Sequence, residues 1–459
     1  MPAPRGVRAS LRWAAGLAVV ATATACAGAG GSGGGGGDGG GGGGGPVTLT
    51  LATVNNPQMV DMEQLKGEFE ADNPDIKVKF VQMEENDLRD AVTKDVATQG
   101  GQYDMVTIGA YEVPLWQQND WIRNLSPYVE ESEDYDVDDL MPPVREAISV
   151  DGELYAVPFY GESSFLMYNK EIFAAAGLTM PENPTWTQVA DLARKAKSAE
   201  HAGICLRGKP GWGEGAASLT TVVNTFGGAW YDEEWNAQVD QPEFAEATQF
   251  YADLLRDAGQ PDPVSTGFTE CLNLFSQGRA AIWYDATSAA GTLESPELSK
   301  VAGKVGYVAA PVQETEASGW LWSWNLAIPS TSKNADQAWE FLSWATSKDY
   351  AKLVGEELGW SRVPPGARLS TYEIPEYQEA AGTFADKTKD TMLAVDPAQP
   401  GVNKQNWVGI QYITIPEWQD LGTQASQKIA EVYAGRSTVD QALAEVQKLA
   451  AAAGEKQKS

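Results

Sequence analysis

Residues 47–109 read VTLTLATVNNPQMVDMEQLKGEFEADNPDIKVKFVQMEENDLRDAVTKDVATQGGQYDMVTIG, and this stretch decides the class of the fold. Three of its segments have the alternation or the short apolar composition of β-strands: 47–56, 76–84 and 103–109. Two segments between them have helical periodicity and end at an Asn-Pro step or at glycines: 59–74 and 86–101. The alternating order of strands and helices predicts a parallel sheet covered by helices on both faces.

Polar and aromatic residues follow each of these predicted strands. Ligands of open α/β sheets bind beyond the carboxyl ends of the strands, so these residues are candidates for ligand contact. We predict contact by Asn56, Tyr111 and Glu112, whereas Glu84 and Glu85 fit a solvated surface better. No glycine-rich phosphate loop follows any of these strands, which argues against a dinucleotide site.

The composition argues against several classes of function. The chain has 459 residues, enough for two lobes, and a formal net charge of −30, which disfavours nucleic acid and anionic lipid headgroups as partners. The single histidine, His201, argues against a zinc or copper site and against a Ser-His-Asp hydrolase. No apolar run beyond residue 30 reaches the roughly 18 residues of a membrane helix, which predicts a soluble body.

The N-terminal residues have the pattern of an export signal followed by a tether. Residues 1–25 begin with basic side chains and continue with a short apolar stretch. Ala23-Thr24-Ala25-Cys26 resembles a bacterial lipobox, with Ala23 where leucine is usual, so we predict a lipid on Cys26 that anchors the protein outside the cytoplasmic membrane. The glycine-rich residues up to 45 then form a flexible tether that spans about 23 Å. Ordinary cleavage after Ala25, with Cys26 incidental, is the alternative.

Two further cysteines, Cys205 and Cys271, remain when Cys26 carries a lipid. An even pair in an oxidising compartment is able to form a disulfide. Two buried free thiols are the alternative, and the sequence leaves both open.

Three later blocks resemble a known family. They read YAVPFYGESSFLMYNKEIFAAAGLTMPENPTWTQVADLA, FTECLNLFSQGRAAIWYDAT and WNLAIPSTSKNADQAWEFLSWATS, and they occur in this order at 155–193, 268–287 and 324–347. Together they are similar to the extracellular solute-binding proteins of ABC sugar importers. Two other segments, at 103–125 and 204–215, look closest to the branch that binds sorbitol, mannitol and related polyols.

The resemblance implies an α/β fold of the type II periplasmic-binding-protein class. Such a fold is a two-lobed clamp in which each lobe has a mixed, mainly parallel sheet flanked by helices. Lobe one would comprise 46–157 plus 308–350, and lobe two would comprise 158–307 plus 351–459. The chain would cross between the lobes near Pro158, Val308 and Asp349, and the ligand would bind in the cleft between them, which closes by hinge motion.

The residues suit a sugar or polyol, because aromatic rings cover its C–H face while charged and amide groups bind its hydroxyls. Trp320, Trp322 and Trp324 alternate and therefore share one strand face. Trp339 and Trp344 fit a helical core instead. Beside the strand-end residues, we predict ligand contacts from the family pattern and from position at strand ends or lobe crossings: Tyr160, Glu162, Arg207, Trp230, Asp285, Trp322, Trp324 and Arg362.

We therefore expect a receptor that captures a polyol or small sugar and delivers it to a membrane permease. We expect a monomer with no cofactor, no metal and no nucleic acid partner. A secreted glycoside hydrolase is the main alternative, but it needs two carboxylates at a defined separation, and the sequence identifies no such pair. An adhesion or structural lipoprotein is a further alternative.

Overall fold

A computed structural model describes residues 45–132 and 134–458; the export signal, Cys26 and most of the glycine tether lie outside the described residues. The first of its two larger sheets has the strand order β2-β1-β3-β11-β6. The strands are β1 (Val47–Val54), β2 (Ile76–Met83), β3 (Met105–Gly109), β6 (Val157–Glu162) and β11 (Trp322–Ala327). The sheet begins with the predicted strand–helix–strand–helix–strand order, and β1 pairs in parallel with β2 and β3.

The second sheet has the order β10-β7-β9-β8. Its strands are β7 (Ser164–Asn169), β8 (Ala202–Cys205), β9 (Ala280–Ala286) and β10 (Val305–Ala309). Both sheets are mixed: β8 and β9 are parallel, whereas β7 is antiparallel to both of its neighbours and β11 is antiparallel to β3 and β6. Within the two sheets as described, the parallel pairs are β1–β2, β1–β3 and β8–β9. A short hairpin, β4 (Ser149–Val150) with β5 (Glu153–Leu154), lies apart from both sheets.

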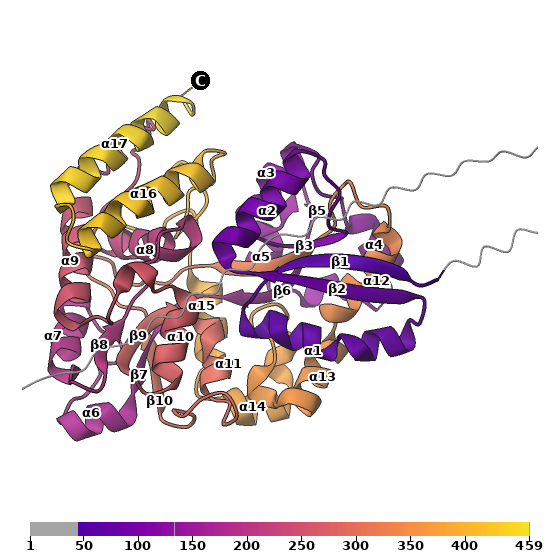
Figure 1. The fold of residues 1–459 in the computed structure, drawn as a ribbon, viewed down its shortest axis with the longest axis horizontal. Coiled ribbons are helices and arrows are strands. Elements are labelled where there is room, and N and C mark those ends of the chain that lie inside the picture. Colours follow the sequence, from indigo (N-terminus) through magenta and orange to yellow (C-terminus); the bar gives the residue numbers. More distant parts are fainter. Residues whose placement is uncertain (1–44, 133, 459) are drawn as a thin grey trace, which may run out of the picture. The chain divides into compact units, whose positions relative to one another are not determined.

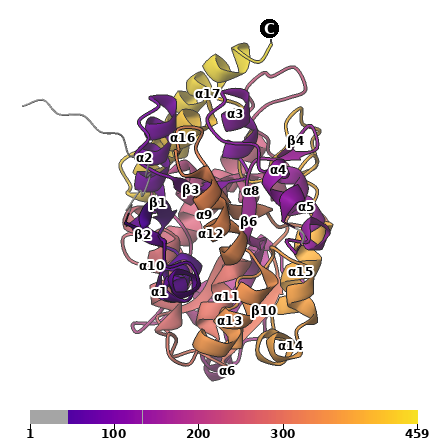
Figure 2. The same ribbon diagram turned by 90° about the vertical axis from the view of Figure 1, so that its right-hand side faces the viewer.

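Helices cover both faces of the first sheet. Figures 1 and 2 show α1 along one face and α2 and α3 on the other. Helix α1 begins at Pro57, which suits a first helical position because it has no N–H to satisfy, and it buries Met62, Leu65 and Phe69 as the periodicity predicts. Five helices precede β6: α1 (Pro57–Asp72), α2 (Glu85–Ala97), α3 (Glu112–Gln118), α4 (Ser126–Glu131) and α5 (Pro142–Ala147). After β11 the chain forms α12 (Ala335–Ala345), α13 (Lys348–Leu358), α14 (Pro375–Ala381) and α15 (Ala385–Ala394).

The remaining helices gather around the second sheet and its neighbours (Figure 1). They are α6 (Lys170–Ala176), α7 (Trp186–Ala196), α8 (Ala217–Thr225), α9 (Pro242–Ala258), α10 (Phe268–Ser276), α11 (Ala290–Leu293), α16 (Trp418–Tyr433) and α17 (Val439–Glu455). Residues 395–417, between α15 and α16, contain no helix or strand. Three single turns matter for the site: η2 (Trp212–Ala216), η4 (Thr287–Ala289) and η5 (Trp360–Arg362).

The chain changes sheet at two places that the strands define. It leaves the first sheet at the end of β6 and enters the second with β7 after one intervening residue, a few residues beyond the crossing predicted near Pro158. It returns through 310–321, between β10 and β11, just after the crossing predicted near Val308. The limits of the two lobes themselves stay a prediction.

A disulfide joins the end of β8 to α10. Cys205 and Cys271 are bonded with a Cα–Cα distance of 5.7 Å and both are fully buried. In the chain-entropy view, closing a loop of this length stabilises the fold by about 4 kcal/mol. Since Arg207 follows Cys205 by two residues, the bond also fixes the segment that carries a candidate ligand contact.

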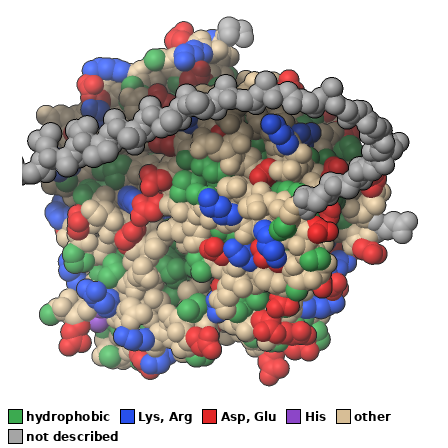
Figure 3. All heavy atoms as spheres, turned by 45° about the vertical axis from the view of Figure 1, so that its right-hand side comes forward, with side chains coloured by type: hydrophobic (Ala, Val, Ile, Leu, Met, Phe, Trp, Pro, Cys, Tyr) green, Lys and Arg blue, Asp and Glu red, His purple; other side chains and the backbone are tan. Residues whose placement is uncertain are grey.

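The surface agrees with the charge of the sequence. Figure 3 shows acidic side chains spread over one face of the molecule with basic side chains between them, as expected at a net charge of −30. Within the described ranges, none of the helices has both the length and the apolar composition that a membrane crossing requires.

Candidate functional site

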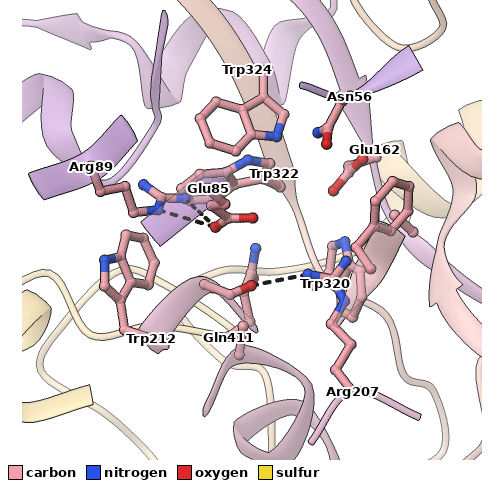
Figure 4. A pocket seen from close by; sticks show the side chains of 14 residues that line it. Asn56, Glu85, Arg89, Glu162, Arg207, Trp212, Trp320, Trp322, Trp324 and Gln411 are labelled. Atoms are coloured by element: carbon pink, nitrogen blue, oxygen red, sulfur yellow. Dashed lines mark hydrogen bonds and ion pairs between the residues drawn. The ribbon is translucent and has the colours of Figure 1, made fainter. Parts of the chain in front are cut away.

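A pocket lies where the carboxyl ends of strands from both sheets meet (Figure 4). Five aromatic rings form part of its wall: Trp212, Phe268, Trp320, Trp322 and Trp324. Four charged side chains reach it: Glu85, Arg89, Glu162 and Arg207. The remaining lining residues are small or amide-bearing: Asn56, Gly213, Ala217, Ala286 and Gln411. The lining residues come from segments far apart in the sequence, so only the folded chain assembles the pocket.

Strand β11 places two indole rings on one face. Trp322 and Trp324 are two residues apart, and their ring centroids are 5.7 Å apart at an interplanar angle of 82°. Glycine is needed opposite them on β3, because a Cβ at Gly109 would lie 1.9 Å from the ring of Trp322. Trp212, on η2, meets Trp322 edge to face with centroids 5.8 Å apart. The result is a rigid aromatic corner suited to the C–H face of a small polar ligand.

Arg207 lies at the end of β8 in a buried charged cluster. Its Nε donates to Asp285 at 2.9 Å, its Nη1 donates to the Gly213 carbonyl at 3.0 Å, and the same Nη1 lies 3.5 Å from Glu214. Burial lowers the pKa of Arg207, but the charges of Asp285 and Glu214 outweigh this and raise it overall. Arg207 is therefore a fixed cation, held between the fully buried end of β9 and η2.

Arg89, on α2, forms a second cluster of the same kind. Its Nη2 lies 2.8 Å from Glu85, one helical turn earlier, and its Nη1 is hydrogen-bonded to Glu112 at the start of α3. The guanidinium lies over the rings of Trp212 and Trp324, at 4.0 and 4.9 Å from the centroids. Burial lowers the pKa of Arg89, and Glu112 and Glu85 more than offset this. The side chain thus fixes the position of the aromatic corner.

Glu162 ends β6 and differs from the other buried acids. Figure 4 shows its carboxylate directed into the space between the labelled side chains. Ser288, on η4, donates its hydroxyl hydrogen bond to this carboxylate. Burial raises the pKa of Glu162 to about 8, although Ser288 and Arg207 act in the opposite direction. Glu162 is therefore mostly protonated at neutral pH and is able to donate a hydrogen bond.

We expect the protonation of Glu162 to make the free energy of unfolding depend on pH. In the unfolded chain Glu162 ionises near 4.5, whereas in the folded protein it ionises near 8. Between these values the folded state binds more protons, so stability falls as the pH rises through that window. Glu162→Gln should remove the part of this decline that Glu162 contributes, roughly 3–4 kcal/mol between pH 5 and pH 8. The part that comes from Glu214, whose pKa burial raises to about 7, should remain. Urea unfolding at both pH values measures it.

An exposed glutamate supplies the control for this experiment. Glu356, on α13, is exposed, and Glu356→Gln should keep the pH dependence of the unmodified protein. Equal pH dependence of the Glu162→Gln variant and the unmodified protein would show that Glu162 holds no proton in the folded state.

The structure brings five of the predicted ligand contacts into the pocket: Asn56, Glu162, Arg207, Trp322 and Trp324. Four others lie directly behind its wall: Tyr111, Glu112, Tyr160 and Asp285. Tyr160 accepts a hydrogen bond from the Asn56 amide at 2.8 Å. Tyr111 packs edge to face on Trp212 and donates to the Ile415 carbonyl at 3.0 Å. These four residues position the lining groups.

Two residues predicted to contact the ligand, Trp230 and Arg362, do not line this pocket. Trp230 packs edge to face on Phe244 and Trp418, and its indole N–H donates to Thr220 at 3.1 Å. Its ring fills the space between α8, α9 and α16. These helices are far apart in the sequence, so sequence patterns do not show that they pack together.

The second displaced residue is Arg362 on η5. Its guanidinium is paired with Asp61 of α1, and neither residue lines the aromatic pocket. Arg362 lines a smaller neighbouring cavity, together with Gln58 and Ser288. The Gln58 amide donates to the Ser288 carbonyl at 3.0 Å, so this cavity lies beside the segment that supports Glu162.

Several lining residues were not predicted as ligand contacts: Glu85, Arg89, Trp212, Phe268, Trp320 and Gln411. Glu85 and Arg89 are one helical turn apart directly after a strand end, which is a usable signal for α2. Trp212 lies between glycines in PGWGEG, where a large ring has room to face a cavity. Gln411 gives no such signal, because residues 395–417 have neither helical nor strand periodicity.

The loop after β8 also touches the first sheet's helix α2 directly. The Asn86 amide donates to the Pro210 carbonyl at 3.0 Å, and Lys209 lies 2.8 Å from Glu84. Glycine is required at this contact, because a Cβ at Gly213 would lie 1.8 Å from the Glu85 carboxylate. Residues 209–213 therefore close one side of the pocket against α2.

Comparison with known proteins supports this description of the chain. The sequence pattern of the family described as bacterial extracellular solute-binding protein matches residues 56–352. A mannitol-binding protein of Pseudomonas aeruginosa is 45% identical over 403 residues, which are 87% of this chain and 91% of that protein.

Solved structures are similar as well. A solute-binding protein of an ABC transporter from Agrobacterium vitis, with bound D-mannitol, is 49% identical, covers 89% of this chain and 99% of its own, and superposes with a TM-score of 0.87. A maltose-bound protein of T. maritima is 17% identical, with coverage of 88% of this chain and 98% of its own and a TM-score of 0.75; this likeness concerns the fold alone. The fold is thus the predicted α/β fold of type II.

Proposed function

Because this chain belongs to the bacterial extracellular solute-binding protein family, we propose that it binds a linear hexitol such as D-mannitol in the aromatic pocket. In this proposal the protein carries out no catalysis, acts as a monomer and passes the hexitol to the membrane permease of an ABC importer. The observation that carries the proposal is the pocket itself, in which an aromatic corner faces hydrogen-bonding groups from both sheets. The identity of 49% to a protein with bound D-mannitol supports the choice of hexitol.

The pocket offers unused hydrogen-bonding capacity. Three buried polar atoms on its wall have no partner among the described residues: Nε1 of Trp212, Nε1 of Trp320 and Oε1 of Gln411. Buried polar atoms are costly when unpaired, so a ligand with many hydroxyls gains by satisfying them. Glu85, Glu162 and Arg207 add charged or protonated groups that bind hydroxyls more strongly than neutral ones do. The rings of Trp212 and Trp322 would cover the C–H face of the same ligand.

The hydrolase alternative has no support from the comparisons. The family and both close relatives are solute-binding proteins. In this proposal the aromatic residues and carboxylates of the pocket serve binding.

A panel of ligands tests the proposed function. Thermal unfolding of the purified mature protein is measured with D-mannitol, D-sorbitol, D-glucose and maltose. At 100 times its Kd a ligand adds about 2.7 kcal/mol of stability, so D-mannitol should raise Tm clearly while maltose leaves it unchanged. Stabilisation by none of the four compounds would contradict the proposed function.

The contact between Gly213 and Glu85 yields a prediction on affinity. Gly213→Ala should weaken D-mannitol binding at least tenfold, because the added Cβ displaces the Glu85 carboxylate that lines the pocket. The free energy of unfolding without ligand should change by less than about 1 kcal/mol, because the atom displaced is the end of the flexible Glu85 side chain. Isothermal titration and urea unfolding measure the two quantities. Gly152→Ala, at a glycine with no atom within 4 Å of its added Cβ, is the control for affinity. If the Gly213→Ala variant binds D-mannitol with unchanged affinity, the contact between Gly213 and Glu85 does not contribute to binding.

We also propose that a lipid on Cys26 anchors the receptor outside the cytoplasmic membrane. The lipobox-like sequence before Cys26 and the glycine-rich tether after it support this. A short tether keeps the receptor at high local concentration near its permease and leaves it free to rotate.

Mass spectrometry of the mature protein from membranes tests the anchor. The N-terminal peptide is expected to begin at Cys26 and to carry a diacylglyceryl group, and Cys26→Ser should release the protein from the membrane fraction. An unmodified N-terminus at Cys26, in protein recovered from the medium, would favour ordinary cleavage after Ala25.

A further inference from the structure

The two guanidinium groups of the pocket are already committed to carboxylates. Arg89 lies between Glu85 and Glu112, and Arg207 lies between Asp285 and Glu214. All of these except Glu85 are at most 8% exposed at their side chains, and Glu85 is 12% exposed. Each guanidinium group is therefore flanked by two carboxyl groups before any ligand arrives. A negatively charged ligand would find no free cation on the pocket wall.

Glu162 adds a fifth carboxyl group that no cation matches. Among residues 45–132 and 134–458, no lysine or arginine nitrogen lies within ion-pair distance of it, and its neighbour is the Ser288 hydroxyl. Figure 4 shows the carboxylates of Glu85 and Glu162 on different sides of the pocket, both facing the space between the rings. In and directly behind the pocket wall, five carboxyl groups therefore surround two guanidinium groups.

We propose that the pocket selects its ligand by charge. It accepts neutral hexitols, binds hexitols with one terminal amino group more tightly through the Glu162 carboxylate, and excludes hexitol phosphates and aldonates. This inference rests on the proposed function, because it names the class of hexitol that the same pocket takes. Glu162 is the specificity-determining residue in it.

The surroundings of Glu162 agree with this role. The polar and charged groups that act on it come from five different segments: Glu85 on α2, Tyr160 on β6, Arg207 after β8, Asp285 on β9 and Ser288 on η4. The two acids oppose its ionisation, and Arg207 is held by Asp285. With its pKa near 8, Glu162 carries a proton at pH 7 when a neutral ligand is bound.

An ammonium group changes this balance. The ligand enters as R–NH₃⁺, the Glu162 carboxyl group loses its proton to the buffer, and an ammonium–carboxylate pair forms. No other bond is made or broken. Binding of an amino-hexitol at pH 7 should therefore release close to one proton, whereas binding of D-mannitol should release almost none. Titrations in buffers of different ionisation enthalpy measure this proton directly.

The test compares four ligands with the purified mature protein by isothermal titration at pH 7. They are D-mannitol, 1-amino-1-deoxy-D-mannitol, D-mannonate and D-mannitol 1-phosphate. We expect the amino-hexitol to bind about tenfold more tightly than D-mannitol. The two anions should bind at least 100-fold more weakly than D-mannitol.

Two variants assign the effect to Glu162. In Glu162→Gln the ratio of amino-hexitol affinity to D-mannitol affinity should fall about tenfold, and the released proton should disappear. In Glu356→Gln, the exposed control on α13, the ratio and the proton should match those of the unmodified protein. If Glu162→Gln fails to fold, the number of protons that the unmodified protein releases on binding the amino-hexitol tests the role of Glu162 instead.

The outcomes separate this inference from the proposed function. Absence of binding by D-mannitol and by the amino-hexitol contradicts the proposed function. Binding of D-mannitol together with an anion of similar affinity overturns charge selection alone. Binding of D-mannitol with no proton release by the amino-hexitol overturns the role of Glu162.

Discussion

Replacing Arg207 with methionine is expected to lower the free energy of unfolding by about 3–5 kcal/mol and to weaken D-mannitol binding more than 100-fold. Arg207 is at most 8% exposed and lies between Asp285, which is fully buried, and Glu214. Removing one partner of a buried ion pair leaves the other charge unpaired, which costs far more than the pair contributes when intact. The loss of affinity follows because the same side chain lines the pocket and holds Asp285 and η2 in place.

Neutralising the remaining acids should reverse part of the loss. The triple variant Arg207→Met, Asp285→Asn, Glu214→Gln removes the unpaired charges and should recover about half of the lost stability, measured by urea unfolding at pH 7. Its affinity for D-mannitol should stay low, because the polar contacts are gone. Arg256→Met, at an arginine whose side chain is 66% exposed, is the control and should change stability by less than about 0.5 kcal/mol. A stability of Arg207→Met close to that of this control would refute the role given to the buried cluster.

Replacing Trp322 with alanine is expected to weaken D-mannitol binding about 100-fold. The ring of Trp322 contacts Trp212, Trp324 and Tyr412, and it closes the pocket on the side of β3. A central aromatic residue of this kind contributes 2 kcal/mol or more to binding when it covers the ligand. Trp322→Phe should bind with intermediate affinity, since a smaller ring covers part of the same face.

Stability and affinity must be separated in this experiment. A buried tryptophan-to-alanine change also costs about 3–5 kcal/mol of folding free energy, so binding is measured at low temperature on protein shown by circular dichroism to be folded. Trp121→Ala, at a half-buried ring that packs on Trp116 outside the pocket, is the control and should keep the affinity of the unmodified protein. Equal affinities of Trp322→Ala and this control would remove Trp322 from the binding site.

Local signals explain the parts of the structure that the sequence predicted well. The alternation in 47–56 and the periodicity in 59–74 depend on neighbouring residues, and β1 and α1 occupy those segments. Asn56 was predicted because it follows β1 directly, and Trp322 and Trp324 were predicted because they alternate on β11. Short-range spacing is enough in such cases, since the strand itself aims the side chain.

The two predicted ligand contacts that do not line the pocket, and one lining residue that was not predicted, have partners set by long-range packing. Trp230 follows two glycines and looks free to face a cavity, but Trp418, nearly 190 residues later, packs against its ring. The sequence around Arg362 shows no partner for its guanidinium group, but in the fold this group is paired with Asp61 of α1. Gln411 reaches the pocket from a segment without regular structure, and its amide donates to the Leu321 carbonyl at 3.0 Å. Such partners are set by the tertiary fold, which single-sequence patterns do not contain.

A crystal structure of the protein with D-mannitol tests the central claim most directly. The account predicts one hexitol in the aromatic pocket, with its C–H face on Trp322 and Trp212 and its hydroxyls within hydrogen-bond distance of Glu162 and Arg207. It also predicts that Trp230 and Arg362 make no contact with the ligand. Density for D-mannitol at another site, with the aromatic pocket empty, would contradict the account.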